Sequence, residues 1–278
     1  MWFAKYTLSI VKSDLDLFPK LHFVKTLTFF NEKGGSGKTT FCLMMASWLR
    51  YRCGYRVAVI DLDGPMHGLN EMRAIDLDVM RNEGRYLLPF IGKDCDPQRD
   101  WYPVITADID GGEEDQKLMD SLIRSLKDDY DYVVIDFGGS FGKGDAVVRF
   151  ISSRLLDLMV VPIYTDEIVL LSALELSYRC SPSGQPRVVF WNRVTRSERD
   201  TSSQDRLAPF SRLFADEGIP ILKTRIPDMV MFRRDCRTWR FLRSTACWPQ
   251  ANVSQLCPEL ETLFTEIKTL LDKGQDNR

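Results

Sequence analysis

Short apolar runs rich in β-branched residues alternate along this chain with longer segments of helical periodicity, and this alternation constrains the fold more than any other feature. Because the apolar runs carry hydrophobic side chains on both faces, they indicate strands of a parallel sheet that helices cover on both sides. The sequence therefore predicts an α/β fold with a doubly wound, mostly parallel sheet flanked by helices. The expected strands span residues 26–30, 57–60, 104–106, 132–135, 158–163 and 188–191, and the expected helices span residues 39–51, 116–126, 168–178 and 258–273.

The chain has 278 residues, a length that a single α/β domain accommodates. We expect residues 24–278 to form that domain and residues 1–23 to be an N-terminal extension. Hydrophobic residues make up 44% and charged residues 27% of the chain, which has no secretory signal and no uncharged run near the roughly 18 residues of a membrane span. Seven scattered cysteines without a Cys-x-x-Cys pair argue against a disulfide framework and a zinc site, and buried thiols are the simplest interpretation. These features indicate a cytoplasmic globular protein.

A glycine-rich segment, Asn-Glu-Lys-Gly-Gly-Ser-Gly-Lys-Thr-Thr at residues 31–40, stands between the first expected strand and the first expected helix. Glycines allow backbone N–H groups to turn toward phosphate oxygens, a lysine meets the phosphate charge, and a hydroxyl ligates Mg²⁺. Gly34, Gly37, Lys38 and Thr39 stand at the positions for these roles. The strand-loop-helix context separates a phosphate-binding loop from a chance glycine-rich turn with an unrelated lysine. The segment is therefore predicted to bind the phosphates and Mg²⁺ of a nucleoside triphosphate.

Carboxylates end two further expected strands. Asp136 follows Val-Val-Ile, and Asp61 and Asp63 follow another apolar run at alternate positions. Mg²⁺ and an attacking water both need fixed oxygens near the γ-phosphate. We expect Asp61 and Asp136 to join Thr39 around the metal, and Asp63 to orient water. Taken alone, Asp61 and Asp63 are also compatible with a plain strand end.

Residues 33–40, together with Asp61-Leu62-Asp63 and Asp136, resemble the deviant Walker A superfamily of P-loop ATPases, which includes ParA, MinD, the nitrogenase iron protein and the arsenical pump ATPase. The resemblance covers roughly residues 24–230. It implies ATP and Mg²⁺ as ligands, an ATP-dependent homodimer, and slow, partner-stimulated hydrolysis that resets the monomer. In this superfamily the additional lysine, here Lys33, reaches across the dimer to the partner's phosphates, so the resemblance places Lys33, Lys38 and Asp63 in catalysis. The phosphate-binding residues that it implies are Lys33, Gly34, Gly35, Ser36, Gly37, Lys38, Thr39 and Thr40.

Two later segments are similar to the adenine-binding parts of the superfamily. Asn192-Arg193 follows the expected strand 188–191, and Ile226-Pro227 resembles the loop over the adenine. The resemblance therefore adds Asn192 and Pro227 to the nucleotide-binding residues. An asparagine that ends a strand in an Asx turn is an equally good interpretation of Asn192.

Other features select among the branches of the superfamily. Residues 137–147 contain no cysteine for the cluster of an iron protein, and no tyrosine follows Tyr178, as a tyrosine-kinase relative would require. Residues 258–278 carry five acids against three bases, and anionic lipid repels such a tail, so we expect no membrane partner. The ParA branch remains, with two departures from partition ParA proteins. Gly64-Pro65 stands where Pro-Gln is usual, and Phe137-Gly138-Gly139 stands where Pro-Pro is usual.

Basic residues concentrate in one late segment. Between residues 223 and 243, seven basic and two acidic residues give a local charge of +5, which leaves −7 for the rest of a chain whose net charge is −2. If residues 231–243 form a helix, its arginines lie roughly opposite its large apolar side chains. Such a face predicts sequence-independent, salt-sensitive contacts with DNA phosphates, whereas a solvated face paired with the acidic remainder is the alternative. The arginines expected to bind DNA, in a region that resembles the non-specific DNA surface of ParA dimers, are Arg233, Arg234, Arg237, Arg240 and Arg243.

Two functions remain open from the sequence. The first is a ParA-like ATPase, cytoplasmic and nucleoid-associated, that forms an ATP-dependent sandwich dimer and binds DNA non-specifically. It would position a plasmid, chromosome or protein cargo with a ParB-like or cargo adaptor. The second is a conjugation or plasmid accessory or regulatory protein that uses nucleotide to shape a partner-binding surface. ATP turnover that DNA or a partner raises favours the first.

Overall fold

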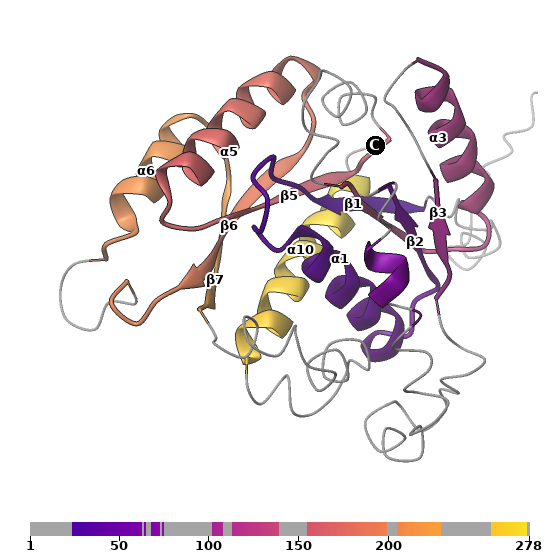
Figure 1. Cartoon of the computed structure of the whole chain (residues 1–278), viewed down its shortest axis with the longest axis horizontal. Helices are drawn as coiled ribbons and strands as arrows, with labels where there is room; N and C mark the ends of the chain where they lie inside the picture. The colour runs from indigo at the N-terminus through magenta and orange to yellow at the C-terminus, as the bar shows by residue number, and fades with distance from the viewer. Residues whose placement is uncertain are drawn as a thin grey trace, which may run out of the picture.

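The computed structural model describes residues 24–62, 64, 68–72, 74, 102–107, 113–138, 155–198, 205–228 and 257–276. Their strands form one seven-stranded sheet in the order β3-β2-β4-β1-β5-β6-β7, and every pairing between these strands is parallel. The first described strand, β1, lies in the middle of the sheet, with β2, β3 and β4 on one side and β5, β6 and β7 on the other (Figure 1). The predicted doubly wound parallel sheet is therefore confirmed. The strands are β1 Lys25–Phe29, β2 Val57–Asp61, β3 Val104–Thr106, β4 Tyr132–Asp136, β5 Leu158–Ile163, β6 Arg187–Val194 and β7 Ile221–Pro227.

Helices cover both faces of this sheet. Figure 1 shows α1 and α10 together on one face, and α3, α5 and α6 on the other. Among the described helices, none is long and apolar enough to cross a membrane. The helices are α1 Lys38–Ser47, α3 Glu113–Leu126, α5 Glu167–Cys180, α6 Ala208–Asp216 and α10 Pro258–Asp276, with short turns η2 Trp48–Arg52 and η5 Ser181–Ser183.

The side chains of each strand divide between two hydrophobic cores. In β2, Val57 and Val59 pack with α1 and α10, whereas Ala58 and Ile60 pack with α3 and α5. Side chains alternate across a strand, so a strand buried on both faces must be apolar at consecutive positions. This arrangement explains why the strand sequences are continuous apolar runs.

The first helix differs from its expected form. It was expected to continue to residue 51, but regular α-helix ends at Ser47 and a π-helical turn, η2, follows. In this wider turn the N–H of Cys53 donates to the carbonyl of Trp48 at 3.1 Å. The turn places the Trp48 ring 5.8 Å from the ring of Phe264 in α10, so it serves the packing between the two helices on this face.

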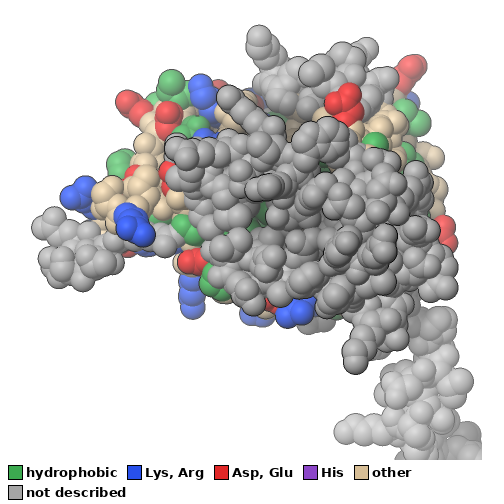
Figure 2. Space-filling model, turned by 60° about the horizontal axis from the view of Figure 1, so that its bottom comes forward, with side chains coloured by type: hydrophobic (Ala, Val, Ile, Leu, Met, Phe, Trp, Pro, Cys, Tyr) green, Lys and Arg blue, Asp and Glu red, His purple; other side chains and the backbone are tan. Residues whose placement is uncertain are grey.

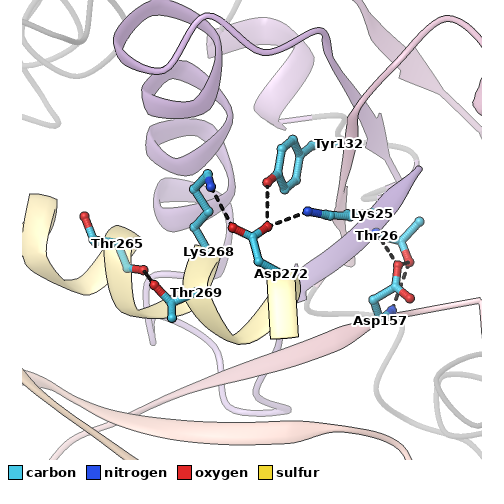
Figure 3. Close-up of polar contacts among 8 residues, drawn as sticks. All are labelled: Lys25, Thr26, Tyr132, Asp157, Thr265, Lys268, Thr269 and Asp272. Carbon is cyan, nitrogen blue, oxygen red and sulfur yellow. Dashed lines mark hydrogen bonds and ion pairs between the residues drawn. The ribbon is translucent and has the colours of Figure 1, made fainter. Parts of the chain in front are cut away.

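A polar cluster fastens α10 to the sheet (Figure 3). The Asp272 carboxylate accepts hydrogen bonds from the ammonium of Lys25, from Lys268 Nζ at 2.7 Å and from the Tyr132 hydroxyl at 3.3 Å. Partial burial opposes ionisation of Asp272, but the bonds from Lys25 and Lys268 outweigh it and lower the pKa of the carboxyl. Because Lys25 and Tyr132 begin β1 and β4, the cluster holds the last turns of α10 at the amino edge of the sheet.

Candidate functional site

The glycine-rich loop joins β1 to α1 at the carboxyl edge of the sheet. Gly35 and Gly37 have φ angles of 75° and 99°, in the left-handed region that favours glycine. A Cβ on Gly37 would lie 3.1 Å from a carbon of the Phe41 ring and 3.4 Å from Asn192 Nδ2. The loop therefore passes close to its neighbours in a conformation that only glycine adopts without strain.

The start of α1 offers donors to an anion. Its N-cap residue, Gly37, gives no side-chain hydrogen bond to the N–H groups of the first turn. These N–H groups, at the positive end of the helix dipole, favour a phosphate. Lys38 is buried, and its Nζ donates to the carbonyl of Lys33 at 3.2 Å. The buried hydroxyl of Ser36 has no hydrogen-bond partner among the described residues. This donor set fits the phosphates of a nucleotide.

Two buried carboxylates lie at the same edge. Asp61 ends β2 and Asp136 ends β4, and the two are register partners in the sheet. Asp61 Oδ2 accepts the N–H of Asn70 at 2.9 Å, which fixes one of its oxygens. The neighbouring thiol of Cys42 has a pKa well above its ordinary value because it is buried and because it faces the Asp136 charge. Carboxylate oxygens and the hydroxyl of Thr39, in the first turn of α1, are ligands suited to Mg²⁺.

Asn31 ties the start of the loop to β5 and α5. Its Oδ1 accepts the N–H of Lys33 at 2.9 Å and the hydroxyl of Ser172 at 3.3 Å, and its Nδ2 donates to the carbonyl of Pro162 at 3.1 Å. The sequence places Asn31 in the predicted phosphate-binding segment but does not predict these contacts, because an asparagine before the loop does not reveal which strand it will meet. The contacts make it a support of the loop.

Asn192 and Arg193, at the end of β6, also contact the loop. Asn192 Nδ2 donates to the carbonyl of Ser36 at 3.0 Å, and the guanidinium of Arg193 donates to the carbonyl of Gly35. Beside them lies a cavity of about 80 Å³, lined in part by Gly37, Asn192 and Pro227. Asn192 and Pro227, the two residues expected to contact the base, thus both line this cavity beside the loop. The base contact itself stays a prediction.

The other predicted site residues lie mostly outside the described part of the chain. Asp63 lies outside the described residues. The arginines expected to bind DNA also lie outside them: Arg233, Arg234, Arg237, Arg240 and Arg243. Two basic residues of the same segment, Lys223 and Arg225, lie in β7, and the Arg225 guanidinium meets the Asp205 carboxylate at 3.0 and 2.5 Å. This contact lowers the pKa of Asp205 and compensates part of the local charge. On the described part of the face in Figure 2, basic and acidic side chains are interspersed.

Comparison with known proteins identifies a related family and fold. The profile of a family described as ATPase MipZ matches residues 25–205. The MinC:MinD cell division protein complex of Aquifex aeolicus has a similar chain, with a TM-score of 0.57, 18% identity and coverage of 91% of this chain and 95% of that chain. The cell division ATPase MinD of Pyrococcus furiosus gives a TM-score of 0.57 at 20% identity, over 88% and 99% of the two chains. A putative plasmid partition protein of Borrelia burgdorferi bound to AMPPNP gives 0.56 at 16%, over 87% and 99%. No curated protein sequence matches the chain.

Proposed function

Since the chain belongs to the ATPase MipZ family and has the fold of ParA/MinD-type P-loop ATPases, we propose that it hydrolyses ATP slowly, dimerises when ATP binds, and positions a plasmid, chromosome or protein cargo. One observation carries the proposal. The glycine-rich loop, the buried Lys38 and the paired carboxylates Asp61 and Asp136 all lie at the carboxyl edge of three neighbouring strands. In open parallel sheets this edge is where ligands bind.

We assign binding of the ATP phosphates to residues 33–40, with Lys38 as the cation beneath the β- and γ-phosphates. Thr39, Asp61 and Asp136 would hold Mg²⁺ directly or through its waters. When bound, the ion supplies neutralisation of charge at the γ-phosphate. Asn192 and Pro227 line the cavity that we assign to the base.

We place the dimer contact at the outer side of the loop. Gly34 and Gly35 are exposed and Lys33 is half-buried, so this side is open to a second copy of the chain. In the proposed dimer Lys33 reaches the partner's phosphates, as the family resemblance implies. Asp63 orients the attacking water, a task separable from nucleotide binding.

We assign DNA contact to the arginine segment of residues 233–243. Each chain would contribute its arginines to one dimer, so the phosphate contacts of two segments would add together. Such binding is independent of sequence and weakens steeply with salt. A nucleoid-associated place in the cytoplasm and a ParB-like or cargo adaptor follow from this proposal.

A second candidate is an accessory or regulatory protein that uses nucleotide to shape a partner-binding surface. The favouring observation is that Ile168 and Leu171 in the first turns of α5 are 60% and 57% exposed. Helix α5 begins just after β5, the strand next to β1, so this apolar surface lies one connection away from the phosphate loop. Large exposed apolar side chains grouped together are typical of partner surfaces.

The test combines ATP turnover with DNA binding by the full chain. Anisotropy of random duplex DNA is measured with ATP, with ADP and without nucleotide, at two salt concentrations, beside ATP turnover with and without DNA. We expect salt-sensitive binding that needs ATP and that Arg237→Glu with Arg240→Glu weakens for all sequences. The matched control is Lys117→Glu with Arg124→Glu, an equal charge change at exposed positions of α3. Absence of ATP-dependent DNA binding by the wild type, together with ATP binding that DNA does not affect, would favour the accessory function.

A further inference from the structure

Two side chains near the end of β6 donate hydrogen bonds to two successive backbone carbonyls of the phosphate loop. The Arg193 guanidinium donates to the carbonyl of Gly35, and Asn192 Nδ2 donates to the carbonyl of Ser36 at 3.0 Å. In a planar trans peptide the carbonyl and the following N–H point in opposite directions. Holding these two carbonyls toward β6 therefore turns the N–H groups of Ser36 and Gly37 away from β6. Those are loop N–H groups of the kind that cradle phosphates.

Arg193 has an unusual backbone conformation for this contact. With a φ of 54°, it is the only non-glycine residue with a positive φ among the described residues. It lies where the register between β6 and β7 shifts, between Trp191 and Val194. A left-handed conformation is disfavoured for a residue with a Cβ and persists only where surrounding contacts determine it.

Two contacts of the Arg193 guanidinium stabilise this backbone conformation. Besides donating to Gly35, it stands 5.1 Å from the centre of the Tyr164 ring, which follows β5. A guanidinium over an aromatic face is attracted to it and is held in one orientation. Arg193 is thereby fixed between the ends of β5 and β6 with its charge directed at the loop.

We propose that Arg193 is a positioning residue for the phosphate loop, which its guanidinium holds in the phosphate-binding conformation before the nucleotide arrives. The inference rests on the proposed nucleotide site and deepens it. Asn192 acts beside it on the next peptide. Arg193 therefore governs affinity for the phosphate chain of the ligand, whatever base the ligand carries.

The experiment compares two ligands that share phosphates but not a base. Calorimetric titration of the full chain measures affinity for ATP and for inorganic tripolyphosphate, each with Mg²⁺. Loss of one charge-assisted hydrogen bond should cost about tenfold in affinity. We expect Arg193→Ala to lower the affinity for both ligands by about that factor. Arg193→Lys should recover part of the lost affinity. Arg187→Ala, the same change at the opposite end of β6, should leave both affinities unchanged.

Arg193→Gly separates the side chain from the backbone, because glycine adopts the left-handed conformation without strain. We expect it to bind both ligands as weakly as Arg193→Ala does, while thermal unfolding shows both variants folded. Wild-type affinity in either variant overturns the inference, as does a loss confined to ATP, which indicates a base contact instead. If the wild type bound neither ligand, the proposed nucleotide function would fail together with the inference. If the wild type binds both ligands and the variants bind them equally well, the inference fails but the proposed function stands.

Discussion

Replacing Gly37 with alanine tests how tightly the phosphate loop is built. A Cβ at this position would lie 3.1 Å from one carbon of the Phe41 ring and 3.4 Å from Asn192 Nδ2, at a φ of 99°. Phe41 cannot turn away freely, because its ring stacks on Phe29 with centroids 5.4 Å apart and meets Phe190 edge-on at 5.0 Å. The substitution therefore has a backbone cost and a packing cost.

Three glycines of the loop separate the two costs. Gly34 has no positive φ and no atom within 4 Å of a built Cβ, so Gly34→Ala should stabilise the fold by about 0.4–1 kcal/mol by lowering the entropy of the unfolded chain. Gly35 has equal space but a φ of 75°, so the left-handed cost of about 1–2 kcal/mol makes Gly35→Ala destabilising by about 1 kcal/mol. Gly37→Ala adds an overpacking cost of about 1–3 kcal/mol, for a total of about 2–4 kcal/mol.

Urea unfolding of the three variants without nucleotide measures these free energies. Stability should fall from Gly34→Ala through wild type and Gly35→Ala to Gly37→Ala. Affinity for ATP should be lowest in Gly37→Ala, because the strained contact of the new Cβ displaces the backbone N–H of residue 37, which belongs to the proposed phosphate cradle. If Gly37→Ala unfolds with the same free energy as Gly35→Ala, the Phe41 ring yields without cost and the packing argument is refuted.

Three further predictions concern charge. Lys38→Ala should reduce ATP affinity at least about 100-fold in a calorimetric titration, because it removes the buried cation beneath the phosphates; wild-type affinity would contradict the site. Asp63→Ala should keep ATP binding but hold the dimer longer, which light scattering and phosphate release measure together; unchanged turnover would move the water-orienting role to another residue. Asp272→Asn should lower the unfolding free energy at pH 7 by about 0.5–1 kcal/mol, a figure discounted for exposure. Because the folded pKa of Asp272 is lowered, its contribution is present above the ordinary pKa of about 4 and disappears as pH falls through the folded value. Equal differences between variant and wild type at pH 3 and pH 7 would exclude this role.

The sheet and most helices could be predicted because each central strand is buried on both faces and therefore apolar throughout. Strand β7 and helix α6, which were not predicted, lie at one edge of the sheet. Strand β7 alternates buried Leu222, Thr224 and Ile226 with more exposed Lys223 and Arg225, the pattern of an edge strand that the concentration of charge concealed. Helix α6 is only nine residues long, and its large apolar side chains do not mark one buried face, because Phe214 is buried whereas Phe210 and Leu213 are exposed.

The candidate site shows a similar division between local and distant information. Gly37 and Lys38 could be predicted from spacing alone, because the loop and helix start are local structures. The contacts of Asn31 with β5 and of Arg193 with Gly35 join residues 131 and 158 positions apart. The residue types at those positions do not reveal their partners, because the partners are backbone carbonyls, which every residue carries. Such contacts depend on which strands become neighbours and are visible only in the fold.

The arginine segment lies within residues 229–256, and described residues on both sides of that stretch line the cavity that we assign to the base. Asp228, the last described residue before the segment, and Leu260, in the first turn of α10 beyond it, both line the cavity beside Asn192. Helix α10 then runs to Asp272 at the amino edge, about 18 Å further at 1.5 Å per residue. The hydrogen bonds of Asp272 with Lys25 in β1 and Tyr132 in β4 hold that far end at the sheet. In the proposed function, a nucleotide in this cavity would contact Asp228 and Leu260, on both sides of residues 229–256, while the far end of α10 stays held at the sheet. This geometry gives a physical reason for expecting DNA binding through residues 233–243 to depend on ATP.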